Sequence, residues 1–224
     1  MCGRFTVASN AEEVSTYLED NFQITNFNLE YKPRYNVAPG QNILSVINDG
    51  LTYRVGYLKW GFVPHFANDN KSSYNMINAK AETIRTKPSF KNSFKDKRCL
   101  IIADGFYEWQ KTLNQKVPKR IILKNEQLFT FAGLWSSYVN PDGTKLYTCT
   151  IITTSASPEV REIHERMPVI LNSKEQQALW LNPEIKDLSL LETLLIPNRE
   201  VTSYEVSTLV NNAKFDSIEC IKKL

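Results

Sequence analysis

The sequence predicts an α+β fold built on antiparallel sheet. Many short segments of its 224 residues are rich in β-branched and aromatic side chains, and few segments have helical periodicity. Asp49-Gly50 and Asp142-Gly143 are pairs typical of tight β-hairpin turns. The regular alternation of strand and helix that builds a doubly wound parallel sheet is missing. Helices are therefore expected to flank the sheet.

Strands are expected where β-branched and aromatic residues concentrate. These segments are Ile43–Ile47, Tyr53–Leu58, Leu100–Ala103, Lys119–Leu123, Leu128–Ala132 and Tyr147–Thr153. The segment from Pro33 to Gly40 is expected to be a loop, because two prolines and a glycine punctuate it.

Three helices are expected beside these strands. The first covers Ala11–Asn21, because Ser9 or Asn10 can cap it and acidic residues fill its first turn. Two shorter ones are expected at Ser157–Ile163 and Ser173–Leu181. A serine and a glutamine placed as a capping box begin the last of them.

Length and composition predict one domain spanning residues 1–224, with a hydrophobic fraction of 42%. No apolar run reaches the ~20 residues that span a bilayer, and no signal peptide is recognisable, so we expect a cytoplasmic protein without membrane contact. Four cysteines are scattered without a CxxC pair, and the chain has only two histidines. Reduced thiols, no metal site and no cofactor are therefore expected.

The second residue is a cysteine, in the opening run Met1-Cys2-Gly3-Arg4-Phe5. Small second residues generally allow the initiator methionine to be removed, so Cys2 is expected to begin the mature chain. Its α-amine (pKa ~7.7–8.0) and thiol (pKa ~8.5) are then both partly reactive near neutral pH. The amine can form a Schiff base with an aldehyde, and the thiol can close a thiazolidine ring. The alternative is that position 2 merely tolerates a small residue.

Three further segments carry candidate polar residues. Asn78 follows an apolar pair and can hold an aldehyde oxygen, or it can simply cap a turn. Glu108 lies between two aromatic residues, where a low-dielectric pocket would raise its pKa, unless it faces water at a strand edge. His164 precedes an Arg-Met-Pro turn and can shuttle protons, although a lone histidine is more often structural. A papain-like peptidase also uses such residues, but its cysteine begins a helix.

A net charge of +3 is too mild to indicate nucleic-acid binding, but its distribution is uneven. Basic residues cluster at Lys80, Arg85, Lys87, Lys91, Lys95, Lys97 and Arg98. Phe90 and Phe94 interleave this basic run, which suits phosphate contact and base stacking. Because they are spaced i, i+4, the two phenylalanines can instead face the core from a solvated helix.

These motifs together resemble the SRAP family, named for SOS-response-associated peptidases and understood as abasic-site processing proteins. The matching segments, in order, are Cys2-Gly3-Arg4-Phe5, Arg34–Gly40, Trp60–Pro64, Ile77–Thr83, Asp104–Trp109 and Ile163–Pro168. A looser match covers Val206–Asn212. The implied fold consists of curved antiparallel sheets forming a barrel-like core with flanking helices.

The resemblance also implies roles for single residues. Cys2 would bond the C1′ aldehyde of an abasic site, Asn78 would be the active-site asparagine, and Glu108 the general acid/base. His164 would lie beside the sugar. The implied partner is single-stranded DNA containing abasic sites, bound by a monomer that is associated with the nucleoid when on DNA.

The predicted DNA-binding residues are Arg4, Arg34, Trp60, Lys80, Lys87 and Lys91. The resemblance places the first three around a DNA channel, and Lys80 stands where many relatives carry arginine. A lysine there keeps the charge but loses the bidentate fork. Two rival functions remain at this point, a thiol peptidase with an N-terminal cysteine and autoproteolytic activity, and a non-enzymatic single-strand-binding module.

Overall fold

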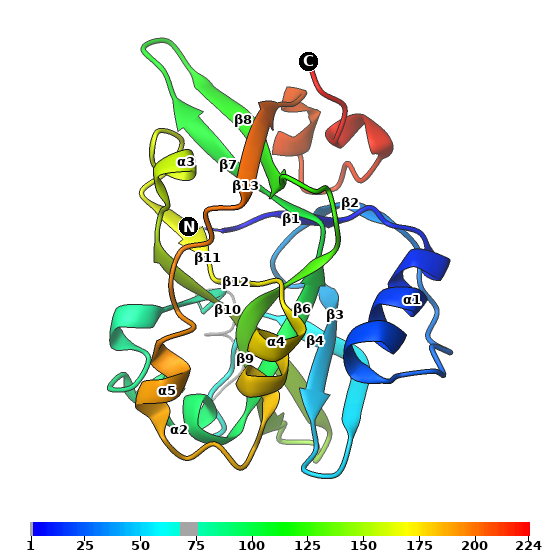
Figure 1. Cartoon of the computed structure of the whole chain (residues 1–224), viewed down its shortest axis with the longest axis vertical. Helices are drawn as coiled ribbons and strands as arrows, with labels where there is room; N and C mark the ends of the chain where they lie inside the picture. The colour runs from blue at the N-terminus through cyan, green and yellow to red at the C-terminus, as the bar shows by residue number, and fades with distance from the viewer. Residues whose placement is uncertain (1, 68–75) are drawn as a thin grey trace.

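The computed structural model describes residues 2–67 and 76–224, which form two β-sheets with helices around them (Figure 1). The smaller sheet has the strand order β13-β8-β7-β1-β2. Its strands are β1 (Phe5–Val7), β2 (Arg34–Val37), β7 (Gly105–Lys111), β8 (Lys116–Leu123) and β13 (Val201–Glu205). Every neighbouring pair in it is antiparallel.

The larger sheet contains the closed part of the fold. Its strands are β3 (Asn42–Asn48), β4 (Tyr53–Trp60), β5 (Asn78–Lys80), β6 (Arg98–Ala103), β9 (Phe129–Val139), β10 (Lys145–Ser155), β11 (Arg166–Pro168) and β12 (Ile170–Leu171). The order β10-β4-β3-β6-β9 closes into a ring because β9 also pairs with β10. This closure confirms the barrel-like core and removes the open edges of the ring. β10 pairs in parallel with β4 and β5, which the sequence did not predict.

The barrel interior is packed closely enough to require a glycine. β6 is buried along its whole length, and β9 crosses it at Gly133, opposite Cys99. A Cβ atom on Gly133 would lie 2.4 Å from the Ile101 Cδ1 atom and 2.9 Å from a β10 carbonyl. Two strands can therefore approach at this position only without a side chain.

Helices cover the outside of the sheets. They are α1 (Ala11–Phe22), α2 (Pro88–Asp96), α3 (Pro158–Arg161), α4 (Lys174–Leu181) and α5 (Leu188–Glu192). Short 3₁₀ turns follow at η2 (Ala81–Thr83), η3 (Thr208–Asn211) and η4 (Ile218–Cys220). The described residues contain no helix long and apolar enough to cross a membrane.

The predicted caps are confirmed at two helices. Asn10 and Glu13 form a complete capping box at α1, and the Ser173 side chain accepts a hydrogen bond from the Gln176 backbone at α4. The loop expected from Pro33 to Gly40 is wrong in its centre, because β2 forms there by pairing with β1. Tertiary pairing outweighs the local turn signals.

The phenylalanines of the basic run face the core. Phe90 and Phe94 lie on α2 and are 1% and 0% exposed, so of the two alternatives the core-facing one is confirmed and base stacking by these rings is excluded. The Phe90 ring contacts Phe62, with 5.3 Å between ring centroids. Arg98 is also buried, and its guanidinium donates to backbone carbonyls, including Trp180 O at 2.7 Å. Arg85 and the lysines of this run remain at the surface.

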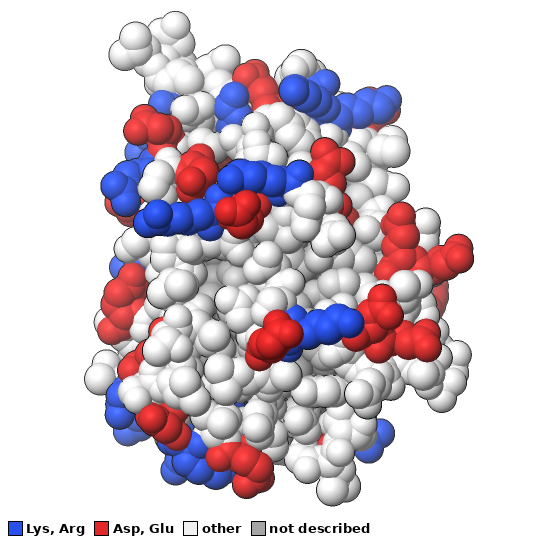
Figure 2. Space-filling view, in the orientation of Figure 1, with Lys and Arg blue, Asp and Glu red and all other residues white. Residues whose placement is uncertain are grey.

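Charged side chains are unevenly distributed on the face of the molecule shown in Figure 2. Figure 2 shows acidic side chains gathered over α1, whose sequence contains no lysine or arginine. Elsewhere on this face acidic and basic side chains are interspersed. A DNA strand is therefore not expected to lie across α1.

A candidate active site between the two sheets

Cys2 lies immediately before β1 and is completely buried. Its backbone carbonyl accepts a hydrogen bond of 2.8 Å from the Nδ2 atom of Asn78, the first residue of β5. The Asn78 Oδ1 atom is buried and accepts no hydrogen bond from the described residues. Asn78 thus links the larger sheet to the segment that contains Cys2. Its Oδ1 atom remains able to accept a hydrogen bond.

Glu108 approaches Cys2 from the smaller sheet. It lies on β7, which pairs with β1 through Phe5 and Phe106. The Glu108 side chain is buried, and this burial raises its pKa to about 7. Burial, and then the charge of Glu108, raise the pKa of the Cys2 thiol well above its usual range. The carboxyl group can hold or release a proton at neutral pH, whereas the thiol stays protonated.

His164 shares a pocket with Glu108. The pocket has a volume of about 520 Å³ and is lined by Glu108, Trp109, Lys111, Lys116, His164 and Asn211. The His164 Nδ1 atom lies 3.0 Å from the Arg166 backbone nitrogen, whose N–H it accepts, which leaves the proton of a neutral ring on Nε2. Burial lowers the pKa of His164, which favours this neutral form. The structure therefore brings all four predicted catalytic residues together.

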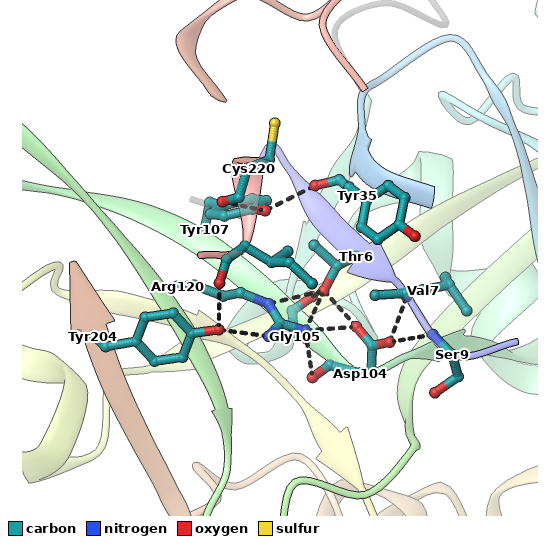
Figure 3. Close-up of polar contacts among 12 residues, drawn as sticks. Thr6, Val7, Ser9, Tyr35, Asp104, Gly105, Tyr107, Arg120, Tyr204 and Cys220 are labelled. Atoms are coloured by element: carbon teal, nitrogen blue, oxygen red, sulfur yellow. Dashed lines mark hydrogen bonds and ion pairs between the residues drawn. The ribbon is translucent and has the colours of Figure 1, made fainter. Parts of the chain in front are cut away.

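A buried polar network anchors β1 beside this site (Figure 3). The Asp104 carboxylate accepts hydrogen bonds from the Thr6 hydroxyl and from the backbone nitrogens of Ala8 and Ser9, the last at 3.0 Å. The Arg120 Nη2 atom donates to Asp104 Oδ1 at 2.9 Å. On its other side, Arg120 Nη1 donates to the Tyr204 hydroxyl at 2.7 Å.

Gly105 makes this network possible. A Cβ atom at this position would lie 2.8 Å from Arg120 Nε and 3.0 Å from Thr6 Oγ1. Sequence reasoning gave Asp104 no role of its own and did not single out Arg120. The sequence did contain one indication. Asp104 directly follows a wholly apolar strand end, and a carboxylate buried there needs a positively charged or hydrogen-bonding partner.

The C-terminal segment closes one side of the site. Arg4 Nη1 donates to Asn36 Oδ1 at 2.8 Å and to Val210 O at 2.7 Å. The Asn36 Nδ2 atom donates to the same Val210 carbonyl and to two further carbonyls of this segment, one of them Phe215 O at 2.8 Å. Arg34 forms an ion pair with Asp216. The two arginines predicted to contact DNA therefore hold protein groups, and their contact with DNA stays a prediction.

The other predicted DNA-binding residues lie in different environments. Trp60 is 0% exposed and its indole donates to Ile77 O at 2.9 Å, so the predicted contact of its side chain with DNA is corrected. Lys80 is exposed two residues after Asn78. Lys87, the residue before α2, and Lys91 on α2 are exposed, and α2 lies at the opposite end of the molecule from the projecting β7–β8 hairpin (Figure 1). Two lysines of the hairpin, Lys111 and Lys116, line the pocket that contains Glu108, and sequence reasoning did not single them out.

Metal ligation is not a feature of the described residues, which contain no group of three or more His, Cys, Asp or Glu placed to hold an ion. The four cysteines are buried free thiols. The chemistry available at Cys2 is thus that of a thiol, a carboxyl group, an amide and an imidazole.

Comparisons with known proteins identify the family of this chain. A family model described as SOS response associated peptidase (SRAP) matches residues 1–213. The chain is 47% identical over 227 residues to abasic site processing protein YoqW of Bacillus subtilis (strain 168), with 99% of each protein covered. It is 32% identical to abasic site processing protein HMCES of Xenopus tropicalis, over 86% of this chain and 66% of that relative.

Solved structures share the fold. A crystal structure of a protein from Bacteroides thetaiotaomicron superposes with a TM-score of 0.84 over all of both chains, at 24% identity, and so shows the fold alone. A phage-related protein from Bordetella bronchiseptica has a TM-score of 0.70 at 28% identity, over 92% of this chain and 95% of that one. Together with the family match over nearly its whole length, these likenesses show that the chain belongs to the SRAP family, whose curated relatives include abasic site processing proteins.

Proposed function

We propose that this protein recognises abasic sites in single-stranded DNA and forms a covalent thiazolidine link to them through Cys2. Removal of Met1 would give Cys2 a free α-amine on the same residue as its thiol. The observation that carries the proposal is the arrangement of this residue beside Glu108, whose pKa lies at about 7, and Asn78, which binds the Cys2 carbonyl. The product would shield the lesion from nucleases and error-prone bypass.

The first stage makes a carbon–nitrogen bond. An abasic sugar is a cyclic hemiacetal. Protonated Glu108 can give its proton to the ring oxygen, and its carboxylate can then take the proton of the C1′ hydroxyl as the ring opens to the aldehyde. The Cys2 amine then attacks C1′ and forms a carbinolamine. The buried Asn78 Oδ1 atom can accept an N–H of this amine and so direct its lone pair at the aldehyde. Loss of one water molecule leaves the imine.

The second stage makes a carbon–sulfur bond. The Cys2 sulfur adds to the imine carbon, and its proton passes to the nitrogen by way of the Glu108 carboxylate or the His164 ring. Aldehyde, amine and thiol have then become a thiazolidine and water. Ring closure removes the iminium that would drive β-elimination and strand cleavage. When the ring reopens, neutral His164 can accept the proton of the ring nitrogen and then, as the imidazolium, give it to the leaving sulfur, so it is assigned to reversal.

The electrostatics of Cys2 favour this reaction over thiol proteolysis. A thiol peptidase needs a thiolate, which a nearby cation or helix N-terminus stabilises. Here burial and the Glu108 charge raise the pKa of the Cys2 thiol. The amine is therefore the first nucleophile, and the thiol acts only after an electrophilic imine has formed.

Single strands suit this site because C1′ must reach a buried residue at the chain terminus. In a duplex the reacting carbon lies within the stacked strand, and extruding it costs free energy. We further propose that the protein acts as a monomer in the reducing cytoplasm, associated with the nucleoid when bound to DNA, where the thiol stays free.

The decisive experiment blocks the amine without touching the thiol. Protein with an uncleaved residue before Cys2 is mixed with abasic single-stranded DNA and run on a denaturing gel beside protein that starts at Cys2. Only the second should give a heat-stable adduct, whose mass equals protein plus DNA minus one water. Proteolytic removal of the extension should restore the adduct. An efficient adduct from protein whose mass proves that Met1 is retained would refute the thiazolidine assignment.

A further inference from the structure

The β7–β8 hairpin presents two lysines to the pocket that contains Glu108 and His164. Lys111 and Lys116 are the last and first residues of the two strands and lie directly opposite each other in the antiparallel ladder. Both are exposed, and both line the pocket. Two like charges at directly opposed positions destabilise a hairpin unless an anion lies between them.

No salt bridge within the described residues neutralises these charges. Neither lysine has an ion pair with a described residue, although exposed lysines elsewhere do, such as Lys222 with Glu219 at 2.6 Å. The turn that joins the strands is fixed instead by Thr112, whose hydroxyl donates to Gln115 O at 2.9 Å. The hairpin therefore holds two ammonium groups at a defined spacing.

The remaining pocket residues leave it positive. Glu108 is about half neutral at pH 7 because its pKa lies there, and His164 adds no negative charge. The charge of Lys111 contributes to lowering the pKa of His164, after burial, so its ammonium acts on this ring. The Trp109 indole donates to the Asn211 Oδ1 atom at 2.7 Å, and this contact joins two residues that line the pocket.

We propose that Lys111 and Lys116 form a subsite for one phosphodiester group of the DNA backbone, the one that joins the reacting sugar to its neighbour. This subsite rests on the proposed function. It is a DNA contact distinct from the one predicted for Lys80, because Lys80 lies on β5 in the other sheet. A negative group between the two ammonium groups relieves their repulsion and fixes the sugar beside Glu108. The exposed position on a projecting hairpin leaves room for the strand to continue (Figure 1).

The first test measures non-covalent binding, so that it does not depend on crosslinking. In a Cys2→Ala background, the Lys111→Gln/Lys116→Gln variant is titrated with a single-stranded oligonucleotide carrying a tetrahydrofuran abasic analogue at several salt concentrations. The slope of log affinity against log salt should fall by about 0.7, the value for one lost phosphate contact on a single strand. The matched control is Lys145→Gln/Lys174→Gln, which removes two exposed lysines outside this pocket. The salt slope of this control should change less than that of the Lys111→Gln/Lys116→Gln variant.

The second test locates the phosphate. Oligonucleotides carry a true abasic site and one neutral methylphosphonate, placed on its 5′ or on its 3′ side. One of the two should slow crosslinking by the parent protein roughly tenfold, the scale of one hydrogen bond to a charged group. The same substitution should have no further effect on the Lys111→Gln/Lys116→Gln variant.

The outcomes separate the two proposals. Absence of any adduct from the parent would overturn the proposed function, while the salt slope would still test the subsite. An adduct that both methylphosphonates leave unchanged, or an equal loss in parent and double variant, would overturn the subsite alone. An unchanged salt slope in the double variant would do the same.

Discussion

The side-chain amide of Asn78 donates a 2.8 Å hydrogen bond to the backbone carbonyl of Cys2, and this contact connects the larger sheet with the N-terminal segment of the smaller one. It fixes the peptide group of the residue that carries both proposed nucleophiles. The carbonyl oxygen of the same amide is buried and accepts no hydrogen bond from the described residues. Asn78 can therefore orient Cys2 from both ends of one side chain.

Asn78→Ala is expected to slow crosslink formation by roughly 10²-fold, the scale for losing a positioned donor. Both the anchor on the Cys2 carbonyl and the acceptor for its amine are lost. The measurement is the single-turnover rate on a denaturing gel at saturating DNA. Near-parental rates with an unchanged melting temperature would show that Asn78 is structural.

The crosslinking rate should depend on pH through Glu108. Because the pKa of Glu108 is about 7, its proton-donating form is lost as pH rises above that value. On the acid side the rate falls because the Cys2 amine, with a reference pKa of ~7.7–8.0, becomes protonated. Glu108→Gln should lower the rate by roughly 10²-fold. Its single-turnover profile should also lose the alkaline decline, and a variant that keeps this decline would remove Glu108 from the acid role.

Glu108 should also make stability depend on pH. Its pKa is raised from an ordinary value of 4.5 to about 7, so the folded state holds this proton more tightly than the unfolded state. The favourable contribution is fully present below pH 4.5 and is lost as pH rises through about 7. The loss amounts to roughly 3 kcal/mol at most. Urea unfolding of Glu108→Gln and parent protein across this range should show a smaller decline in the variant.

The Asp104–Arg120 pair should matter more than a surface pair. Both side chains are buried, and Asp104 also holds the backbone after β1. Arg120→Leu leaves a buried carboxylate unpaired and should reduce the free energy of unfolding by roughly 3–5 kcal/mol. The control is Arg54→Ala, which breaks an exposed pair with Asp49 and should cost about 1 kcal/mol or less. Similar losses in chemical denaturation would contradict a special role for the buried network.

The α2 lysines should affect affinity rather than chemistry. Lys87, Lys91 and Lys95 are exposed, but α2 lies at the other end of the long axis from the β7–β8 hairpin (Figure 1). Changing all three to Gln should weaken binding of long single strands and reduce its salt slope by about 2. The crosslinking rate at saturating DNA should stay unchanged. If the salt slope does not move, these lysines form only a solvated helix face.

The sequence correctly predicted those structural elements that are determined by residues adjacent in the chain. The cap at Asn10, the hairpin turns and the apolar run of β6 are each decided within a few positions, so their structure follows from the sequence. The same reasoning failed at β2, because a strand at a sheet edge is formed by its partner. It also left open which way Phe90 and Phe94 face, since the pattern fits both a core and a DNA surface.

The sequence by itself determined the class of fold, the family and the four residues that carry the proposed chemistry, because their types and order are specific. Only the tertiary structure decided their environment. Glu108 acquires a pKa of about 7 because packing removes water around it, and Trp60 is excluded from the surface by the barrel that buries it. Lys111 and Lys116 join the site because β7 and β8 pair in one register. Burial and strand pairing depend on residues far apart in the chain, so no local pattern can specify them.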